Sequence, residues 1–206
     1  MLSRVDLAPT EPFEPVAPTG PLPRAERHAA IIRGAAVAFA RRGYAATSME
    51  QIAAASGITK LIVYRHFASK EELYRAVLQR VFDRLAEEFL TGYSRRPEGG
   101  GVGARSMLRV ARENPSGFEL LWRHAAREPQ FAEYASELRD HAVDASRALL
   151  EQRVDPTLRE WAAQTVVGYL VEATLNWLAF GDPARDQEFI ELATAAVRVA
   201  IGTWSS

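Results

Sequence analysis

The chain has 206 residues, no cysteine and a formal net charge of −1. This length suits one sizeable globular unit, or a small domain joined to a larger one. Without cysteine neither a disulfide framework nor a thiolate metal site can form, and we expect a reducing, cytoplasmic environment.

Composition divides the chain into three parts, 1–23, 24–75 and 76–206. The first holds six of the eleven prolines and lacks the basic start and apolar core of a signal peptide, so we expect a disordered arm. The second holds nine arginines and lysines against four acids, whereas the rest of the chain has an excess of six acids. This distribution indicates that a polyanion meets only the basic segment.

The basic segment carries the signals of three helices and the start of a fourth. The first, 25–42, has one apolar stripe and is followed by Gly43 as a stop signal. Thr47, with Glu50 three residues later, predicts a capping box for a short second helix, which Gly57 ends.

Two further caps follow. Thr59 is placed to cap a third short helix that runs to Phe67. Ser69 with Glu72 predicts a second capping box, which opens a long helix leading out of the basic segment.

The third part continues after a glycine-rich loop at 94–103. Polar residues followed by proline then mark helix starts. The predicted helices lie near 116–127, 129–153, 156–180 and 184–204. Strand signals are almost absent, so we predict an all-α fold, in which a three-helix amino-terminal domain is linked by a long helix to a helical bundle.

The last two predicted helices are apolar around most of their circumference, and their own core can bury only one face of each. We therefore expect a homodimer through a four-helix bundle formed by these helices. The expected second surface consists of Leu192, Ala193, Ala196, Val197, Ala200, Ile201 and Trp204. A membrane span at 162–180 is not expected, because Glu172 at bilayer depth would cost roughly 2.5–3.5 kcal/mol.

Two short helices joined at Gly57 are typical of a helix-turn-helix, which sets its second helix in the DNA major groove. The marking residues are Phe39, Gly43-Tyr44, Thr47-Ser48, Ile52-Ala53, Ala55, Gly57-Ile58, Val63-Tyr64, His66-Phe67 and Lys70-Glu71-Glu72-Leu73. In their order and spacing, residues 24–73 resemble the DNA-binding domain of TetR-family transcriptional regulators. The resemblance implies a dimeric, repressor-like regulator, whose two heads bind a palindromic operator in double-stranded DNA and whose second domain binds a small effector.

The expected polar DNA contacts are at helix starts and along the second helix of the motif. They are Thr47, Ser48, Thr59, Lys60, Tyr64, Arg65, His66 and Lys70. Side chains at helix starts suit phosphates, and Lys60 can reach a guanine edge. Tyr64 and His66 are expected to contact phosphates by likeness to the family, and Arg65 adds charge.

Leu61 and Ile62 depart from the family, in which small, polar or proline residues are more usual at these positions. Their side chains cannot hydrogen-bond base edges, but they can pack on thymine methyl groups. Ile62 has two alternatives, the DNA or the helix bundle, whereas Val63 and Phe67 are expected in the core. For the whole cluster, the alternative is a solvated set of charges on ordinary helices.

A hydrophobic or aromatic effector would suit the large apolar side chains of the second domain. The candidate ligand-binding residues are Met107, Phe118, Leu121, Trp122, Tyr134, Tyr169, Glu172, Asn176 and Trp177. Glu172 and Asn176 lie one helical turn apart, where they recognise a polar ligand group or pair with each other or with the partner subunit. The alternative for the aromatic residues is an ordinary core.

Enzymatic signals are absent from the sequence. There is no Ser–His–Asp grouping, P-loop or dinucleotide-binding glycine pattern, and His124 and His141 lack the neighbours that a metal site needs. We therefore expect neither an enzyme nor a cofactor. The alternatives to an operator-binding regulator are a helical enzyme or small-molecule-binding protein, and a dimeric adaptor without a ligand cavity.

Overall fold

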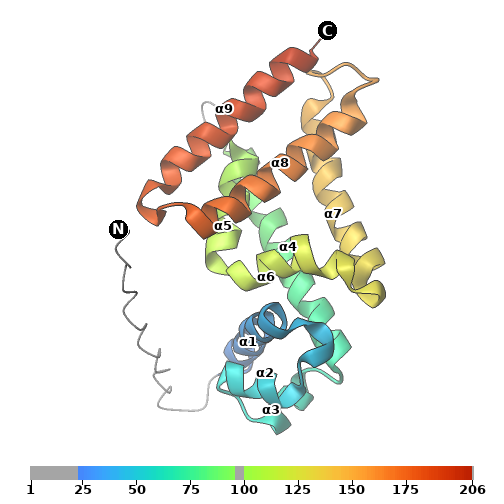
Figure 1. Cartoon of the computed structure of the whole chain (residues 1–206), viewed down its shortest axis with the longest axis vertical. Coiled ribbons are helices and arrows are strands. Elements are labelled where there is room, and N and C mark those ends of the chain that lie inside the picture. Colours follow the sequence, from blue (N-terminus) through green and yellow to red (C-terminus); the bar gives the residue numbers. More distant parts are fainter. Residues whose placement is uncertain (1–22, 96–99, 206) are drawn as a thin grey trace, which may run out of the picture.

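The computed structural model describes residues 23–95 and 100–205. Within them the chain is helical and contains no strand, which confirms the all-α prediction (Figure 1). The α-helices are α1 (Arg24–Ala46), α2 (Met49–Ser56), α3 (Lys60–His66), α4 (Lys70–Ser94), α5 (Val102–Glu113), α6 (Pro115–Glu119), α7 (Pro129–Leu150), α8 (Arg159–Phe180) and α9 (Asp186–Trp204). The predicted arm lies outside the described residues except for Pro23.

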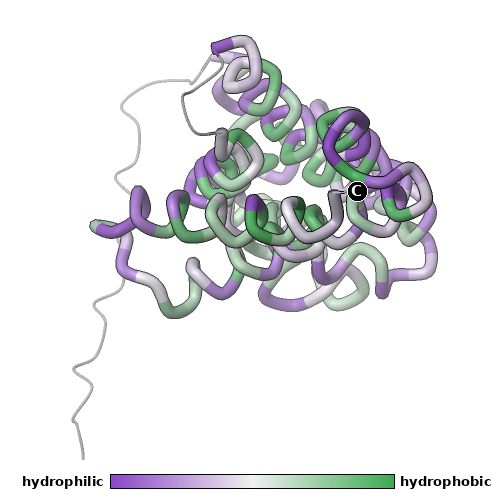
Figure 2. Tube along the Cα trace, turned by 90° about the horizontal axis from the view of Figure 1, so that it is seen from above, coloured by the Kyte–Doolittle hydropathy of each residue, from purple (hydrophilic) through white to green (hydrophobic). Residues whose placement is uncertain are grey.

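The head of the molecule consists of α1, α2 and α3, and α4 runs from it into the body formed by α5 to α9 (Figure 1). Apolar and polar residues follow each other along the helices (Figure 2), and the apolar side chains of the head pack together. Ile31, Phe39, Ile52 and Val63 come from three helices and are completely buried. This shared core sets the angle between α2 and α3.

Two glycines end helices as the sequence predicts. Gly43 has φ 75° and ψ 166°, which breaks the regular turns of α1 near its end. Gly57 has φ 64°, the left-handed conformation that favours glycine, and its N–H donates to the carbonyl of Ala53. The Gly57 turn lets α3 leave α2 sharply.

The first predicted capping box is wrong by one residue. Ser48, not Thr47, caps α2: its hydroxyl accepts from the N–H of Gln51 at 3.3 Å, and the Gln51 side chain accepts from the N–H of Ser48 at 2.9 Å. Thr47 is buried, and its hydroxyl donates to the carbonyl of Gly43 at 2.7 Å. Thr47 and Ser48 both fit the sequence pattern of a capping box. Because Thr47 is buried, Ser48 takes the capping position at the start of α2.

The later caps are only partly as predicted. Thr59 precedes α3 but makes no side-chain capping bond. Ser69 accepts from the N–H of Glu72 at 3.0 Å, while the Glu72 carboxylate reaches one residue further back and accepts from the N–H of Ala68 at 2.7 Å. The start of the long helix is nevertheless correct.

An aromatic cluster joins the head to the body. Its members are Phe39 and Tyr44 from α1, Tyr74 from α4 and Phe131 from α7. The Tyr74 and Phe131 rings stack with centroids 4.2 Å apart, and Tyr44 meets Phe131 edge-on at 4.8 Å. Such pairs contribute about 0.5–1.5 kcal/mol each beyond the burial of their area. The head is therefore packed against both α4 and the start of α7.

The body contains one helix that the sequence did not predict. Helix α5 begins at Val102, inside the predicted 94–103 loop, and ends where Asn114 caps α6. The predicted 116–127 helix is instead α6 followed by a π-helical turn (Leu120–His124) and a 3₁₀ turn (Ala125–Arg127). A further 3₁₀ turn, Pro183–Arg185, precedes α9.

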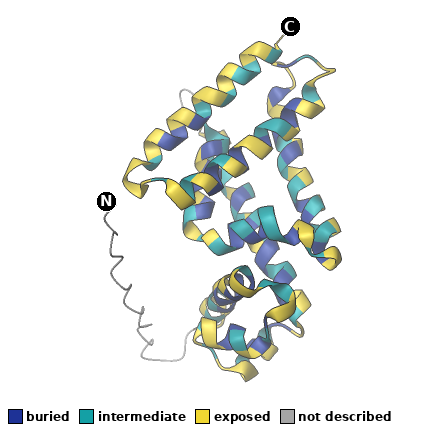
Figure 3. Ribbon diagram, viewed as in Figure 1, coloured by how far each residue is buried: buried dark blue, intermediate teal, exposed yellow. Residues whose placement is uncertain are grey.

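Helices α8 and α9 carry many exposed residues (Figure 3), and several of them are large and apolar. Phe180 is 89% exposed, and Leu192 and Val199 are 61% and 69% exposed. The expected surface on α9 is partly wrong, because Ala193 is buried within the body and Val197 and Ile201 face a cavity. The helix carries two apolar faces, and the exposed one runs through Leu192 and Val199.

We expect Gly34→Ala to destabilise the head, because α1 passes close to the end of α2 at this position. A Cβ on Gly34 would lie 2.7 Å from the backbone N of Ser56 and 2.8 Å from its Cα. The expected loss is about 1–3 kcal/mol in the free energy of unfolding, measured by chemical denaturation.

The control is Gly202→Ala near the end of α9, where no atom lies within 4 Å of an added Cβ. This variant is expected to be more stable by about 0.5–1 kcal/mol, the usual gain for alanine over glycine in a helix. Equal stability of Gly34→Ala and the parent chain would contradict the close approach of the two helices.

Candidate DNA-binding helix and effector cavity

One side of α3 packs on the head and the other is open. Val63 and the following Phe67 are buried, as predicted. Lys60, Leu61, Tyr64 and Arg65 are exposed, and Leu61 is 65% exposed. Ile62 and His66 are half-buried at the edges. The open side of α3 thus carries two large side chains with apolar surface, Leu61 and Tyr64, beside the charges of Lys60 and Arg65.

Lys60 forms an ion pair with Glu50 from α2. The hydrogen bond from Lys60 lowers the pKa of the Glu50 carboxyl to about 2, and the same bond raises the pKa of Lys60. The Lys60 ammonium also lies 5.7 Å from the centre of the Tyr64 ring. The most exposed cation at the start of α3 is thus held by a neighbouring carboxylate.

Lys70 has a role inside the head that the sequence did not indicate. Its ammonium donates to the carbonyl of Tyr44 at 2.8 Å and to that of Ala45 at 3.3 Å, and it lies 4.3 Å from the centre of the Tyr44 ring. These carbonyls end α1, where a cation is favoured. Lys70 therefore ties the start of α4 to the end of α1.

The other expected contacts differ in their surroundings. Ser48 is half-buried at the start of α2, and Thr59 is exposed. The hydroxyl of Thr47 is used within the head, so this conformation does not present it to a phosphate. The ring of His66 lies 5.8 Å from that of His28, and burial, followed by the charges of His28, Arg24 and Arg27, lowers the pKa of His66.

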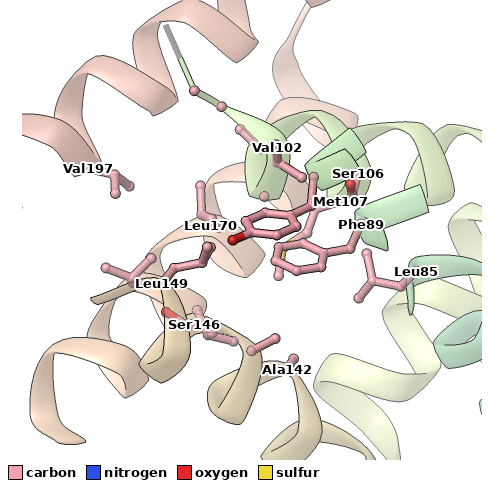
Figure 4. Close-up of a pocket in the computed structure, with 18 of the residues that line it drawn as sticks. Leu85, Phe89, Val102, Ser106, Met107, Ala142, Ser146, Leu149, Leu170 and Val197 are labelled. Atoms are coloured by element: carbon pink, nitrogen blue, oxygen red, sulfur yellow. The ribbon is translucent and has the colours of Figure 1, made fainter. Parts of the chain in front are cut away.

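A cavity of about 820 Å³ lies in the body between α4, α5, α7, α8 and α9 (Figure 4). Its walls are mainly apolar, with Leu85 and Phe89 from α4, Met107 from α5, Leu149 from α7 and Leu170 from α8. The volume falls within the roughly 300–1,000 Å³ that is usual for small-molecule sites. The body can therefore hold an effector.

Of the nine candidate ligand-binding residues, only Met107 lines this cavity. Phe118 and Leu121 are buried elsewhere in the core, and Trp122 packs beside Phe118 with ring centroids 6.1 Å apart. The Tyr134 hydroxyl donates to the side chain of Gln79 at 2.5 Å. These four side chains lie in the core between the helices or pack against it, and they do not line the cavity.

The four candidates from α8 also lie outside the cavity. Tyr169 and Asn176 are exposed. Glu172 is paired with Arg123 at 2.7 Å rather than with Asn176, and Trp177 donates to the Asp186 carboxylate at 2.7 Å. The opposite side of α8, with Val166, Val167 and Leu170, faces the cavity. A helix that is apolar all round does not reveal from its sequence which side does so.

Ion pairs connect the helices around the cavity. Arg84 from α4 donates to Glu113 from α5 at 2.8 Å, and Arg112 from α5 donates to Asp186 from α9 at 2.8 Å. Arg112 also lowers the pKa of Asp186 by its hydrogen bond. These pairs fix α5 between the long helix and α9.

Comparison with known proteins agrees with this geometry. Residues 31–77 match the family of bacterial regulatory proteins, tetR family. The transcriptional activator FasR of Mycolicibacterium smegmatis is 48% identical over 64 residues, which cover 31% of this chain and 29% of that protein. The amino-terminal part of this chain is therefore similar to the TetR family. The chain matches less than a third of the relative's length, and the family match covers most of the head and the start of α4.

The fold of the head and the body together is also found in solved structures. A TetR-like transcriptional regulator from Rhodococcus sp. RHA1 superposes with a TM-score of 0.73 at 23% identity, covering 88% of this chain and 98% of that one. AibR, solved in complex with isovaleryl coenzyme A and operator DNA, superposes with a TM-score of 0.66 at 21% identity, covering 83% and 97%. These likenesses show that the head and the body together have the same fold as these structures.

Across residues 23–95 and 100–205, no three His, Cys, Asp or Glu side chains are grouped so that they could hold a metal ion. His124 lies 3.6 Å from Glu119, and His141 lines the cavity beside Phe82. In the same part of the chain, no helix has the length and apolarity that a membrane span requires.

We expect the Glu50 carboxyl of the TetR-family head to titrate near pH 2 in the folded protein, as followed by NMR of the side-chain carbonyl carbon. Because its pKa is depressed, the stability that the pair contributes is present above the ordinary carboxyl pKa. It is lost as the pH falls through the folded value.

Lys60→Ala should return the Glu50 titration toward its ordinary range, since Lys60 supplies the main stabilising hydrogen bond. Lys70→Ala removes the only other lysine and should leave this titration in place. An unchanged Glu50 pKa in the Lys60→Ala variant would show that the ion pair does not form in solution.

Proposed function

We propose that this chain is a ligand-responsive, DNA-binding transcriptional regulator that acts as a homodimer. The observation that carries the proposal is the open side of α3. Directly after the Gly57 turn, it offers Lys60, Tyr64 and Arg65 on a head that matches the TetR family. A helix so placed suits the major groove, with its basic and hydroxyl groups toward the duplex.

The side chains of α3 divide naturally between backbone and base contacts. Tyr64 and Arg65 suit phosphates, and Lys60 suits a phosphate or a guanine edge once it leaves Glu50. Leu61, at 65% exposure, is placed to pack against thymine methyl groups. Half-buried Ile62 serves the packing of α3 more than the bases. We propose an operator with thymine opposite Leu61.

The homodimer is proposed through the outer faces of α8 and α9. The exposed side chains Trp161, Phe180, Leu192 and Val199 provide the apolar surface, and exposed Ala196 allows close approach of a second helix pair. Two heads held by such a seam can meet half-sites about one helical turn, roughly 34–36 Å, apart.

The effector signal is proposed to pass along α4. This helix lines the cavity at Phe82, Leu85 and Phe89, and its other end is fixed to the head by Lys70 and by the ring of Tyr74. A ligand that moves the cavity end of α4 therefore tilts the head and changes the separation of the two α3 helices. A cavity of about 820 Å³ also counts against an adaptor with a filled core.

Lys60→Ala should weaken binding to an operator selected from genomic fragments and reduce the salt-dependence slope by about 1, since it removes one phosphate or base contact. Glu50→Gln should act oppositely and tighten binding about fivefold, because it removes the carboxylate that competes with DNA for Lys60. Affinity is measured by fluorescence anisotropy over a range of salt concentrations.

Glu87→Gln provides a matched control, with the same loss of charge on the exposed surface of α4 in the body. Its operator affinity should equal that of the parent chain. If Lys60→Ala retains full affinity and an unchanged salt slope, α3 does not bind DNA as proposed.

Leu192→Glu should convert the dimer to a monomer, because it places a charge in the centre of the apolar seam. Sedimentation velocity measures the change. Leu61→Glu introduces the same charge at an equally exposed leucine on α3 and should remain dimeric. A monomeric parent chain, or a dimeric Leu192→Glu variant, would contradict the proposed interface.

A further inference from the structure

The cavity has an interior and a mouth of different chemistry. Buried residues such as Leu85, Met107 and Leu170 form the interior. Exposed lining residues, among them Tyr93, Leu149 and Arg153, form the mouth. A molecule that fills both must therefore have an apolar part and a part that remains in contact with water.

Positive charge is concentrated at the mouth. Arg153, just after α7, and Arg198, from α9, both line the cavity and are exposed. The Arg153 side chain has no ion pair or hydrogen bond with the described residues. Among the described lining residues there is no aspartate or glutamate. The mouth therefore attracts an anion and repels a cation.

Two serines, themselves largely buried, interrupt the apolar interior. Ser106 on α5 and Ser146 on α7 are 3% and 9% exposed, and both line the cavity (Figure 4). Neither hydroxyl has a hydrogen-bond partner within residues 23–95 and 100–205. Because these hydroxyls line the cavity without a protein partner, they suit a polar atom of the occupant or a water beside it.

We propose that the effector is an amphipathic anion, with an extended apolar body inside the cavity and an acidic head group at the mouth beside Arg153. This inference rests on the proposed function, because it names the ligand class of the same effector cavity. The Phe89 and Tyr93 rings, which stack at 6.3 Å, line the apolar path inward. A single-chain carboxylic acid and its thioester with a phosphorylated carrier share this chemistry.

The test compares four probes that share a dodecyl chain and differ in their head group: dodecanoic acid, dodecanoyl coenzyme A, dodecanol and dodecylamine. Binding to the full chain is measured by calorimetry without DNA, below the micelle concentration of each probe. We expect at least one of the two anionic probes to bind about fivefold more tightly than dodecanol, and dodecylamine to bind most weakly. The better of the two anions identifies the head group.

Arg153→Gln should remove this preference by weakening the better anion about fivefold while leaving dodecanol unchanged. Arg80→Gln, an exposed arginine of α4 outside the lining, should change neither affinity. Ser146→Phe fills the cavity and should abolish the binding of all four probes. Dodecanol or dodecylamine binding as tightly as both anions, or an Arg153→Gln variant with full preference for the anion, overturns the proposal. Undiminished binding of the probes to the Ser146→Phe variant also overturns the proposal.

Operator binding is measured separately with each probe, so that the two proposals fail in different ways. If dodecanol or dodecylamine alters operator affinity and the anions do not, the ligand class is wrong and the regulatory function stands. If an anion binds the cavity with the predicted Arg153 dependence but no DNA is bound at all, the ligand class is supported and the regulatory function fails.

Discussion

The arrangement of the molecule depends on the packing of four aromatic rings at the junction of head and body. Phe39 and Tyr44 belong to α1, Tyr74 to α4 and Phe131 to α7, so three helices distant in sequence meet in one cluster. Burial raises the pKa of the Tyr74 hydroxyl well above its ordinary value. Rings packed in this way resist sliding, because a close-packed interior has few intermediate arrangements. The direction in which α3 points is consequently set by the body as well as by the head.

This constraint gives α4 its importance. The helix is anchored at one end by Lys70 and the aromatic cluster, and at the other it forms a wall of the cavity. Arg84 lies within the stretch of α4 that lines the cavity, and it is bonded to Glu113 of α5, which is in turn followed by α6 and the π-helical turn beside α1. For the proposed effector response, the structure thus offers two routes from the cavity to the head, one through α4 itself and one through the turns that follow α5.

The head could be predicted from the sequence because its signals are local. Apolar spacing, glycine stops and hydroxyl caps lie within a few residues of the elements they define, and the errors were confined to Thr47, whose role falls to Ser48, and to the partners of Thr59 and Glu72. The body was less predictable. Helix α5 starts without a proline or a hydroxyl cap and follows three glycines, so nothing local marks it. The cavity depends on how five helices face one another, and the aromatic residues expected to line it are mostly used in the core.

The ion pair between Glu50 and Lys60 bears on how such a protein would search a genome. A free ammonium would attract any phosphate, and sequence-independent attraction of this kind holds a protein on the millions of sites that are not its target. With Glu50 beside it, Lys60 gains little from exchanging one anion for another at an arbitrary sequence. Exchanging the Glu50 carboxylate for a DNA phosphate becomes favourable only where the other side chains of α3 also fit the DNA sequence. If α3 binds DNA as proposed, a single acidic residue outside this helix would thereby shorten residence on the wrong DNA and improve discrimination without touching a base.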